Sequence, residues 1–449
     1  MDPCGIAGRS GLLKTRFTCI ATIAMLMLGC AETPETPDAP ETEDETTVTE
    51  WRGYTSDEME SFRSEIDLDN WDDGGEISRF TFLNTAPFFP TDTIERAGPV
   101  AALEYAEDPA IGSFPVSLDG DRTTTFDDYV DGASIDGIVI LQGGRIAYEK
   151  YPRMRSDDRH ILFSLSKVYV STLVAILEDR GLLLVDEPVE RYIPELASGG
   201  WRGVKVRDIL DMASGIDARE WVDGAYTNPE RKHYQYEASL GWLSKTESMP
   251  ESVHRGSTYD FLANLGQLSN PGTTFDYISV NSAVLGWLVE KMTGNSFAEV
   301  LSDEIWSQIG AEADGQITVN DSGRAAVHAG IVASLRDVAR FGLLFTPSHP
   351  VVNAEGLISD AYLQKIQSGG REELMEESPY SDQVPRPRYV SYQWQVYGDG
   401  SFFKGGFAGQ GLYIDPDKDI VLAFVGTHGY GEVSPSPLEA CLKMFAELY

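Results

Sequence analysis

The run ILFSLSKVYVSTLVAIL, residues 161–177, constrains the fold of this chain more than any other segment. After Lys167 the run is apolar on nearly every face, which is typical of a helix buried in a domain core. Ser164 and Lys167 are three residues apart, so on a helix they share a face, whereas Ser166 points elsewhere. The pattern predicts a buried helix that begins with Ser-x-x-Lys. A helix-capping serine followed by a surface lysine is the simpler alternative.

The chain is long and apolar enough to bury a large core. It has 449 residues, of which 42% are hydrophobic, and it contains 8 Trp and 20 Tyr, so one large domain or two are expected. The formal net charge of -36 argues against a nucleic-acid partner, because phosphates need Lys and Arg to neutralise them. The charge instead suggests a solvated surface that faces a saline or anionic exterior.

The N-terminus has the features of a targeting segment. Arg9, Lys14 and Arg16 precede FTCIATIAMLMLG, an apolar run too short for a comfortable membrane span. The run ends in MLGC, which resembles the lipobox of bacterial lipoproteins. This resemblance implies a signal peptide over residues 1–29, a lipid anchor on Cys30 and a place in the bacterial cell envelope, facing the periplasm or the exterior. An ordinary secretory signal and an uncleaved anchor remain the alternatives.

An acidic tether is expected to follow the lipidated cysteine over residues 30–50. Its sequence, AETPETPDAPETEDETTVTE after the cysteine, is rich in Pro, Thr and acids and holds almost nothing that could be buried. Two of the four cysteines leave with the signal peptide and Cys30 carries lipid, which makes Cys441 the only free thiol of the folded part. No intrachain disulfide is therefore expected.

Globular composition begins at Trp51. We expect an irregular N-terminal flank with one or two helices over residues 51–130, and the main domain over residues 131–449. GIVILQ-GG-RIAYEKY, residues 137–151, predicts a β-hairpin with a two-glycine turn. Helical patterns dominate from residue 164 to about residue 345, with a stop at Gly181, and strands return after about residue 390 before a last helix. This order predicts an α/β protein of the α+β type, with one antiparallel sheet and an inserted helical subdomain.

Two further segments could join the serine and lysine in one site. PGTTFDYISVNSAVLGWLVEKMTG, residues 271–294, places Tyr277 just ahead of a helix, although an ordinary half-buried tyrosine would fit as well. FFKGGFAGQGLYIDP, residues 402–416, places Lys404 on a strand before Gly405 and Gly406. Glycines inside a strand often mark the approach of a ligand to the backbone, and a simple bulge or turn is the alternative.

The order and spacing of these motifs resemble the serine β-lactamase and penicillin-recognising hydrolase family. The likeness is strongest to its class C-like branch of family VIII esterases and 6-aminohexanoate-oligomer hydrolases. The family pattern is Ser-x-x-Lys, Tyr-x-Asn about a hundred residues on, and Lys/His-Thr/Ser/Gly-Gly near the C-terminus. This resemblance covers roughly residue 80 to the C-terminus and implies the β-lactamase/transpeptidase-like fold.

The resemblance also implies a role for each residue of the motifs. Ser164 would be the nucleophile of a covalent acyl-enzyme, Lys167 would share its proton, and Tyr277 would be general base and then general acid. The backbone N–H groups of Ser164 and Phe407 would hold the oxyanion. Lys404 would either pair with a substrate carboxylate or support Tyr277, and the sequence leaves both roles open.

Two departures from the family pattern bear on the substrate. Ser279 stands where the β-lactam-hydrolysing enzymes have Asn, and Gly405 stands where they usually have Thr or Ser. We therefore expect a hydrolase of carboxylic esters or small amides. The alternatives are a β-lactamase, a D-amino-acid peptidase, and a non-catalytic envelope-anchored binding protein on the same fold. Trp221 and Tyr226 could form pocket walls or simply pack in a loop.

Other catalytic classes lack their motifs in this sequence. There is no G-x-S-x-G for an α/β-hydrolase nucleophile, and no H-E-x-x-H, paired C-x-x-C, Walker loop or G-x-G-x-x-G after a strand. We accordingly expect no metal and no cofactor. The predicted partners are a small ester or amide and, through the lipid, a membrane.

Overall fold

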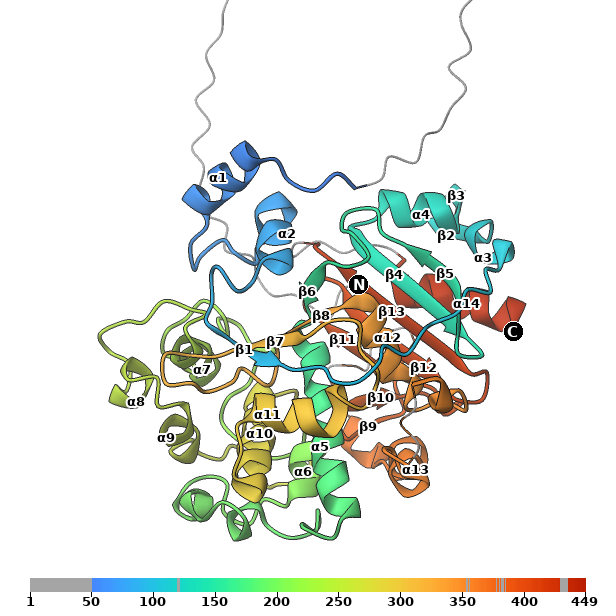
Figure 1. Cartoon of the computed structure of the whole chain (residues 1–449). Helices are drawn as coiled ribbons and strands as arrows, with labels where there is room; N and C mark the ends of the chain where they lie inside the picture. Colours follow the sequence, from blue (N-terminus) through green and yellow to red (C-terminus); the bar gives the residue numbers. More distant parts are fainter. Residues whose placement is uncertain are drawn as a thin grey trace, which may run out of the picture.

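An antiparallel sheet of seven strands forms the centre of the protein (Figure 1). The computed structural model describes residues 51–118, 122–352, 354, 356–376, 378, 380, 383, 385–428 and 435–449. The strands follow the order β5-β4-β13-β12-β11-β10-β9 across the sheet. Their bounds are β4 (Ile135–Gln142), β5 (Arg145–Lys150), β9 (Tyr389–Ser391), β10 (Trp394–Val396), β11 (Phe402–Gly406), β12 (Gln410–Asp415) and β13 (Ile420–Gly426). The predicted bracketing of the helices by early and late strands is therefore confirmed, since β4 pairs with β13.

The predicted hairpin is also present. Strands β4 and β5 are joined by Gly143 and Gly144, whose φ angles of 57° and 72° suit the two-residue turns that only glycine enters without strain. Both faces of the central strands are buried, so β4 and β13 are apolar at successive positions and send alternate side chains into two cores. Ile140 and Leu422 face the smaller core, whereas Val139 and Val421 face the larger one.

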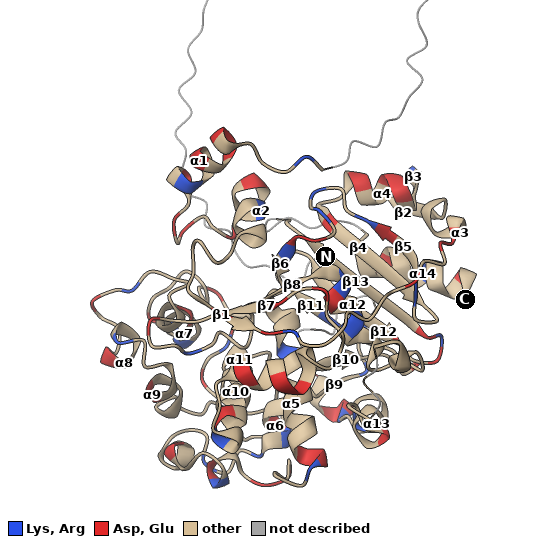
Figure 2. Ribbon diagram, in the orientation of Figure 1, with Lys and Arg blue, Asp and Glu red and all other residues tan. Residues whose placement is uncertain are grey.

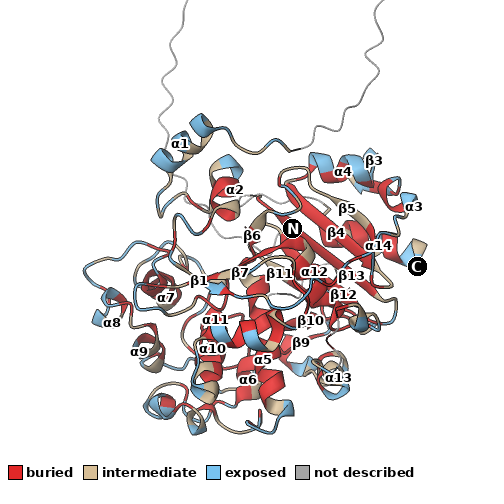
Figure 3. Ribbon diagram, in the orientation of Figure 1, coloured by how far each residue is buried: buried red, intermediate tan, exposed pale blue. Residues whose placement is uncertain are grey.

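Helices cover both faces of the sheet. On one face, α4 (Phe126–Gly132) and α14 (Pro437–Leu448) enclose the smaller core, where Cys441 is a buried free thiol. On the other face, α12 (Leu335–Leu343) packs on β13, with α5 (Lys167–Asp179) and α10 (Ser279–Thr293) packed against each other beyond it. Figure 3 shows α5, α10 and α12 as largely buried, whereas α1 (Ser56–Glu65) and α8 (Glu251–His254) are largely exposed or partly exposed.

The remaining helices surround α5 and α10 and form the inserted helical part. Most are short, and they leave long connecting loops between them. Their bounds are α6 (Val206–Leu210), α7 (Lys232–Leu240), α8 (Glu251–His254), α9 (Thr258–Ala263), α11 (Phe297–Leu301) and α13 (Asp360–Ser368). Single turns lie at η1 (Phe163–Ser166), η2 (Val189–Arg191), η3 (Pro194–Ser198), η4 (Ser302–Trp306), η5 (His349–Val352) and η6 (Glu372–Met375).

Two smaller sheets were not predicted. A four-stranded sheet has the order β1-β7-β8-β6, and a separate hairpin pairs β2 with β3. Their bounds are β1 (Thr91–Ile94), β2 (Pro115–Leu118), β3 (Arg122–Thr125), β6 (Arg159–Ile161), β7 (Gly315–Thr318) and β8 (Ile331–Ser334). Strands of three or four residues show too little alternation to be recognised, and β7 and β8 lie inside the stretch that was predicted to be mostly helical. Strand β6 matters for function, because its end leads directly into Ser164.

The N-terminal flank contains more structure than the one or two helices expected. It contributes α1 (Ser56–Glu65), α2 (Gly75–Leu83), α3 (Pro109–Gly112) and α4, together with β1, β2 and β3. Trp71 and Phe82 of this flank are part of the larger core, so the flank packs on the main domain. Within the described ranges, no helix is both long and apolar enough to cross a membrane.

Acidic residues lie on the outer helices. Figure 2 shows Asp and Glu on α1, α4 and α8, with Lys and Arg interspersed among them. In α4 alone, Asp127 and Asp128 lie in the first turn, where a carboxylate is stabilised by the positive end of the helix dipole. Part of the negative net charge thus lies on solvated helix surfaces.

Candidate active site

Ser164 and Lys167 lie at the junction of two elements. The sequence predicted both on one helix, but Ser164 is on the 3₁₀ turn η1 and Lys167 is the first residue of α5. The tighter turn preserves the expected contact, because the Lys167 Nζ donates to the Ser164 Oγ over 2.8 Å. The same amine donates to the backbone carbonyl of His328 over 3.1 Å. Lys167 is therefore held against the serine by an acceptor on its other side.

Burial makes the Lys167 amine easier to deprotonate. The side chain is fully buried, and desolvation lowers its pKa to about 8, while Glu220 and Glu237 act in the opposite direction. A lysine with such a pKa is partly neutral near neutral pH and can accept a proton from a neighbouring hydroxyl. This is the property that a Ser-x-x-Lys pair needs for acyl transfer.

The second serine of the motif faces another element. The Ser166 Oγ accepts the backbone N–H of Ile331 over 3.1 Å, which ties turn η1 to strand β8. Phe163, on the other side of Ser164, has a φ of 44°, a left-handed conformation that costs energy for a residue with a large side chain. The turn therefore presents Ser164, half-buried, at a sharp bend held by its neighbours.

Tyr277 and Lys404 complete the polar cluster. Tyr277 lies two residues before α10, as predicted, and Lys404 lies on β11. The Lys404 Nζ donates to the Tyr277 hydroxyl over 3.0 Å, and the amines of Lys404 and Lys167 lie 4.5 Å and 5.1 Å from the centre of the tyrosine ring. Burial and the charge of Lys167 hold the pKa of Lys404 well below its usual range. Tyr277 thus lies close to two lysines that both tend to lose their protons.

The two glycines after Lys404 bring β11 close to the serine turn. A Cβ on Gly406 would lie 2.5 Å from the carbonyl oxygen of Leu162, so no larger residue fits there without moving the backbone. Phe407 follows the strand directly, and its ring meets that of Phe163 edge-on, with the ring centres 5.5 Å apart. Gly406 therefore permits the close approach of Phe407 to Ser164.

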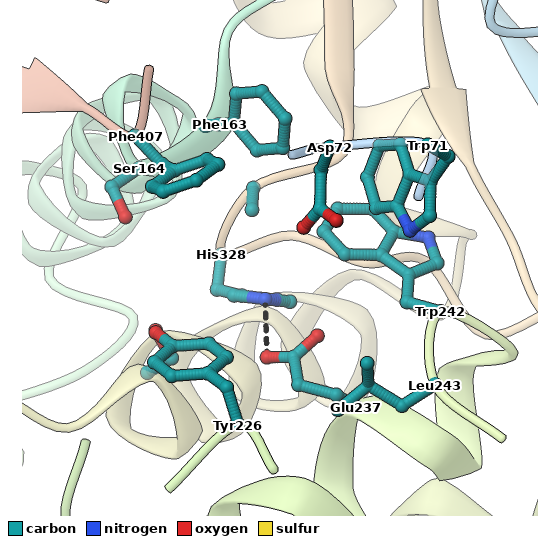
Figure 4. A pocket seen from close by; sticks show the side chains of 12 residues that line it. Trp71, Asp72, Phe163, Ser164, Tyr226, Glu237, Trp242, Leu243, His328 and Phe407 are labelled. Carbon is teal, nitrogen blue, oxygen red and sulfur yellow. Dashed lines mark ion pairs between the residues drawn. The ribbon is translucent and has the colours of Figure 1, made fainter. Parts of the chain in front are cut away.

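A cavity opens beside Ser164 (Figure 4). Ser164 and Phe407 lie at one end, Trp71 and Trp242 form an aromatic wall, and a carboxylate, Glu237, lies opposite the serine. The residues lining the cavity come from the N-terminal flank, turn η1, helix α7, the first residue of α10 and several loops: Trp71, Asp72, Phe163, Ser164, Tyr226, Glu237, Trp242, Leu243, Ser279, His328, Ala329 and Phe407.

The deepest part of the site is a buried polar network that the motifs did not indicate. The Glu237 carboxylate lies 3.0 Å from the His328 Nε2, and the Tyr236 hydroxyl lies 2.9 Å from the His328 Nδ1. Burial and Lys167 keep the pKa of His328 well below its ordinary value, so the imidazole is neutral. A neutral ring that donates to Glu237 must accept the Tyr236 hydroxyl. This arrangement of protons holds when Glu237 is ionised, and burial raises the pKa of that carboxyl to about 7.

From the sequence, Trp221 and Tyr226 could each form a wall of the pocket or simply pack in a loop. The structure gives the two residues different places. Tyr226 lines the cavity, whereas Trp221 stacks on Tyr277 with the ring centres 5.3 Å apart and a 14° angle between planes. Trp71, Asp72 and Glu237 were missed altogether. No motif marks Glu237, because it lies in KHYQYEASL, a run that is polar in composition.

The protein has an antiparallel sheet with helices on both faces, and its site brings together a serine, two lysines and a tyrosine. These features define the class of β-lactamase-like serine hydrolases. The family model described as Beta-lactamase matches residues 123–438. The chain belongs to this family, as its motifs predicted. The fold prediction is confirmed with it.

Several individual proteins are similar to this chain in sequence or in structure. The 6-aminohexanoate-dimer hydrolase of Paenarthrobacter ureafaciens is 30% identical over 359 residues, which are 79% of this chain and 86% of that protein. Among solved structures, a Bacillus anthracis protein provisionally assigned as a 6-aminohexanoate-dimer hydrolase superposes with a TM-score of 0.69 at 21% identity, over 86% of this chain and 97% of that one. A family VIII carboxylesterase gives a TM-score of 0.52 at 18% identity, over 72% and 95%. At these identities the structures show the fold alone.

Proposed function

We propose that this protein is a serine hydrolase that acts on carboxylic esters and small amides through a covalent acyl-enzyme. The observation that carries the proposal is the 2.8 Å contact between the Lys167 amine and the Ser164 hydroxyl at the mouth of a cavity. The family comprises hydrolases, and the proteins that this chain resembles include an amide hydrolase and a carboxylesterase.

The first half-reaction forms the acyl-enzyme. The Ser164 Oγ attacks the substrate carbonyl while its proton passes to the base formed by Lys167 and Tyr277, and the carbonyl oxygen becomes an oxyanion. Collapse of the tetrahedral intermediate breaks the bond to the leaving alcohol or amine. That group takes up the same proton from Tyr277. In the second half-reaction, water attacks the Ser164 ester, and the proton it loses returns to the serine.

The oxyanion would be held by the backbone N–H groups of Ser164 and Phe407. Both residues line the cavity, and the close approach at Gly406 supports their pairing. For Lys404, the contact with the Tyr277 hydroxyl favours the supporting role over the pairing with a substrate carboxylate, because the amine is buried and already engaged.

Charge at the cavity favours some substrates over others. Asp72 and Glu237 line it, and a carboxylate on the substrate would be repelled by either of them when ionised. β-Lactam antibiotics carry such a carboxylate, whereas simple esters do not. The name of a relative that is 30% identical, a 6-aminohexanoate-dimer hydrolase, also points to linear amides. We therefore rank esters and linear amides ahead of β-lactams and D-amino-acid peptides.

A non-catalytic binding protein on the same fold is the alternative of another class. It would have no use for a partly neutral lysine in contact with a serine, so the lowered pKa of Lys167 counts against it. For the location of the enzyme, we propose the bacterial cell envelope with a lipid on Cys30. That cysteine lies outside the described residues, and the proposal depends on the MLGC motif.

Covalent labelling tests the proposal directly. A fluorophosphonate probe should label the wild-type protein and fail to label Ser164→Ala. Ser166→Ala is the matched control, because it lies two residues away and binds strand β8 instead of the cavity. Labelling that survives in Ser164→Ala, or no labelling of the wild type, would reject the acyl-enzyme. A parallel assay of p-nitrophenyl esters, nitrocefin, D-amino-acid peptides and linear amides would rank the substrates.

A further inference from the structure

Glu220 is a buried carboxylate that no motif of the family resemblance includes. It lies on the loop between α6 and α7 and is only 3% exposed. One carboxylate oxygen accepts the backbone N–H of Ser279, the first residue of α10, and the other accepts the Tyr226 hydroxyl over 3.2 Å. The carboxylate thus lies at the positive end of a helix of 15 residues, where it stabilises the helix and is itself stabilised. Glu220 therefore fixes the beginning of α10.

Trp221, the residue after Glu220, contacts the ring of Tyr277. The Trp221 indole stacks on the Tyr277 ring, as described above, and meets the ring of Tyr380 edge-on with the ring centres 5.0 Å apart. Tyr277 is two residues before Ser279, so adjacent loop residues hold both its ring and the backbone that follows it. A phenol held in this way has little freedom to leave Lys404.

Charged and titratable groups from several elements surround the Glu220 carboxylate. Lys167 of α5 and Lys404 of β11 lie within its electrostatic reach, and it favours the charged form of both amines. On α7, the His233 Nδ1 lies 3.9 Å from the carboxylate, and Glu237 acts on the Lys167 amine as Glu220 does. The other groups that face this cluster are His328, Tyr226, Tyr277 and the exposed ion pair of Arg219 with Asp276. Glu220 is the carboxylate that acts on both lysines.

We propose that Glu220 and Trp221 form a clamp that positions Tyr277, and that Glu220 supplies the negative charge which balances the two active-site lysines. Both are positioning residues, since neither is placed against the reacting atoms. The contact uses the backbone N–H of residue 279 and therefore makes no demand on its side chain. The inference rests on the proposed function for its effect on kcat. Its effect on the pKa values of the two lysines does not depend on that function.

The electrostatic consequence is measurable without any substrate. Lysine side chains labelled with ¹³C at Cε can be titrated by NMR, with Lys167→Arg and Lys404→Arg used to assign the two signals. In Glu220→Gln, which keeps a side-chain acceptor for the Ser279 N–H, the pKa values of Lys167 and Lys404 should both fall. Glu220→Asp keeps the charge and should leave both titrations close to wild type. Glu290→Gln is the matched control, because Glu290 lies on α10, the helix that Glu220 caps, but binds Tyr259 and Arg324.

A wild-type titration of Lys167 in a folded Glu220→Gln protein would overturn the charge role. If that variant does not fold, Glu220→Asp and Trp221→Leu test the clamp. Each should lower kcat for p-nitrophenyl butyrate by about tenfold to a hundredfold, with a smaller change in KM, because Tyr277 is displaced. Trp221→Phe should recover most of the loss, and wild-type kcat in Trp221→Leu would overturn the clamp. Absence of fluorophosphonate labelling in the wild type would reject the proposed function instead, leaving the lysine titration as the test of Glu220.

Discussion

Lys404 and Tyr277 are 127 positions apart in the chain, yet the lysine amine donates to the phenol over 3.0 Å inside the protein. Lys167 lies close to the same tyrosine, with its amine 5.1 Å from the ring centre. Two ammonium groups cannot both stay charged in so buried a space without raising the free energy, so at least one amine is driven towards neutrality. The tyrosine therefore lies close to two amines that could act as bases, which suits proton transfer to and from a leaving group.

Ser164, Lys167 and Tyr277 should behave as one unit. Ser164→Ala, Lys167→Ala and Tyr277→Phe are each expected to lower kcat by orders of magnitude, and the double variants should lose little more than the singles. Ser166→Ala should stay close to wild type, since its hydroxyl serves the backbone of Ile331. Steady-state kinetics on p-nitrophenyl butyrate would check this, and an inactive Ser166→Ala beside an active Ser164→Ala would contradict the assignment.

Activity should rise with pH through the titration of Lys167. Only the neutral amine can take the serine proton, and burial places the pKa of Lys167 at about 8. Below that pH, kcat/KM should fall about tenfold for each further unit if this amine is the only titrating group. A kcat/KM profile for the wild type that is flat on both sides of pH 8 would contradict the role of Lys167 as a base.

The same lysine should also make the free energy of unfolding depend on pH, at pH values above its pKa in the folded protein. Its pKa is about 8 in the folded protein against 10.5 for an unperturbed lysine, so between these values the unfolded chain binds more protons. The contribution of this group to the free energy of unfolding therefore increases with pH across that window. Lys167→Met should remove the increase, and urea titrations of both proteins at about pH 8 and about pH 10 would measure it.

Gly406→Ala should damage the site and the fold together. The added methyl group would collide with the Leu162 carbonyl oxygen at 2.5 Å, and the resulting shift of β11 should cost about 1–3 kcal/mol and lower kcat. Gly398→Ala is the control, because a Cβ there meets nothing within 4 Å. A Gly406→Ala protein as stable and active as Gly398→Ala would show that this approach does not position Phe407.

Esters should be better substrates than β-lactams by a wide margin. Gly405 and Ser279 lack the side chains that hydrogen-bond the antibiotic in the β-lactam enzymes, and each lost partner costs about 1–3 kcal/mol. Together the two losses approach about a hundredfold or more in rate. Similar kcat/KM values for nitrocefin and p-nitrophenyl butyrate would refute this, whereas Gly405→Thr combined with Ser279→Asn should move the ratio towards nitrocefin.

Cys30→Ser should release the protein from membranes or block its maturation. The expectation follows from the MLGC motif after a short apolar run, and cell fractionation with N-terminal mapping of the mature chain would measure it. Cys441→Ser provides a control, because that thiol is buried in the folded part. Unchanged membrane attachment of Cys30→Ser would refute the lipid anchor.

The parts of the structure that could be predicted are those with local signals. The glycine pair between β4 and β5 and the apolar run after Lys167 each identify an element by its own residues. The four-stranded sheet has no such signal, since β1 pairs with β7 across more than two hundred residues and each strand has four residues. Pairings of that kind depend on the whole fold, which a local pattern does not describe.

The residues of the candidate site also fall into two groups, those that the sequence could predict and those that it could not. Ser164, Lys167, Tyr277 and Lys404 could be selected because they occur in spaced motifs, but Glu220 and Glu237 could not. A glutamate in a loop or a polar helix is normally exposed to solvent. Helix α7 illustrates the difficulty, because KHYQYEASL is polar in composition and yet eight of its nine residues, His233–Leu240, are buried. Its polar face is covered because it encloses the cavity.

The pairing of β4 with β13 also determines when the candidate active site can form. Ser164 leaves the ribosome 240 residues (404 − 164) before Lys404, and the strand next to β4 comes later still. A nascent chain, or one cut before β11, holds the nucleophile but lacks Lys404 and Phe407. Such long-range pairing also makes folding slow. The proposed hydrolysis can therefore begin only after β11, β12 and β13 have been synthesised and have paired with β4.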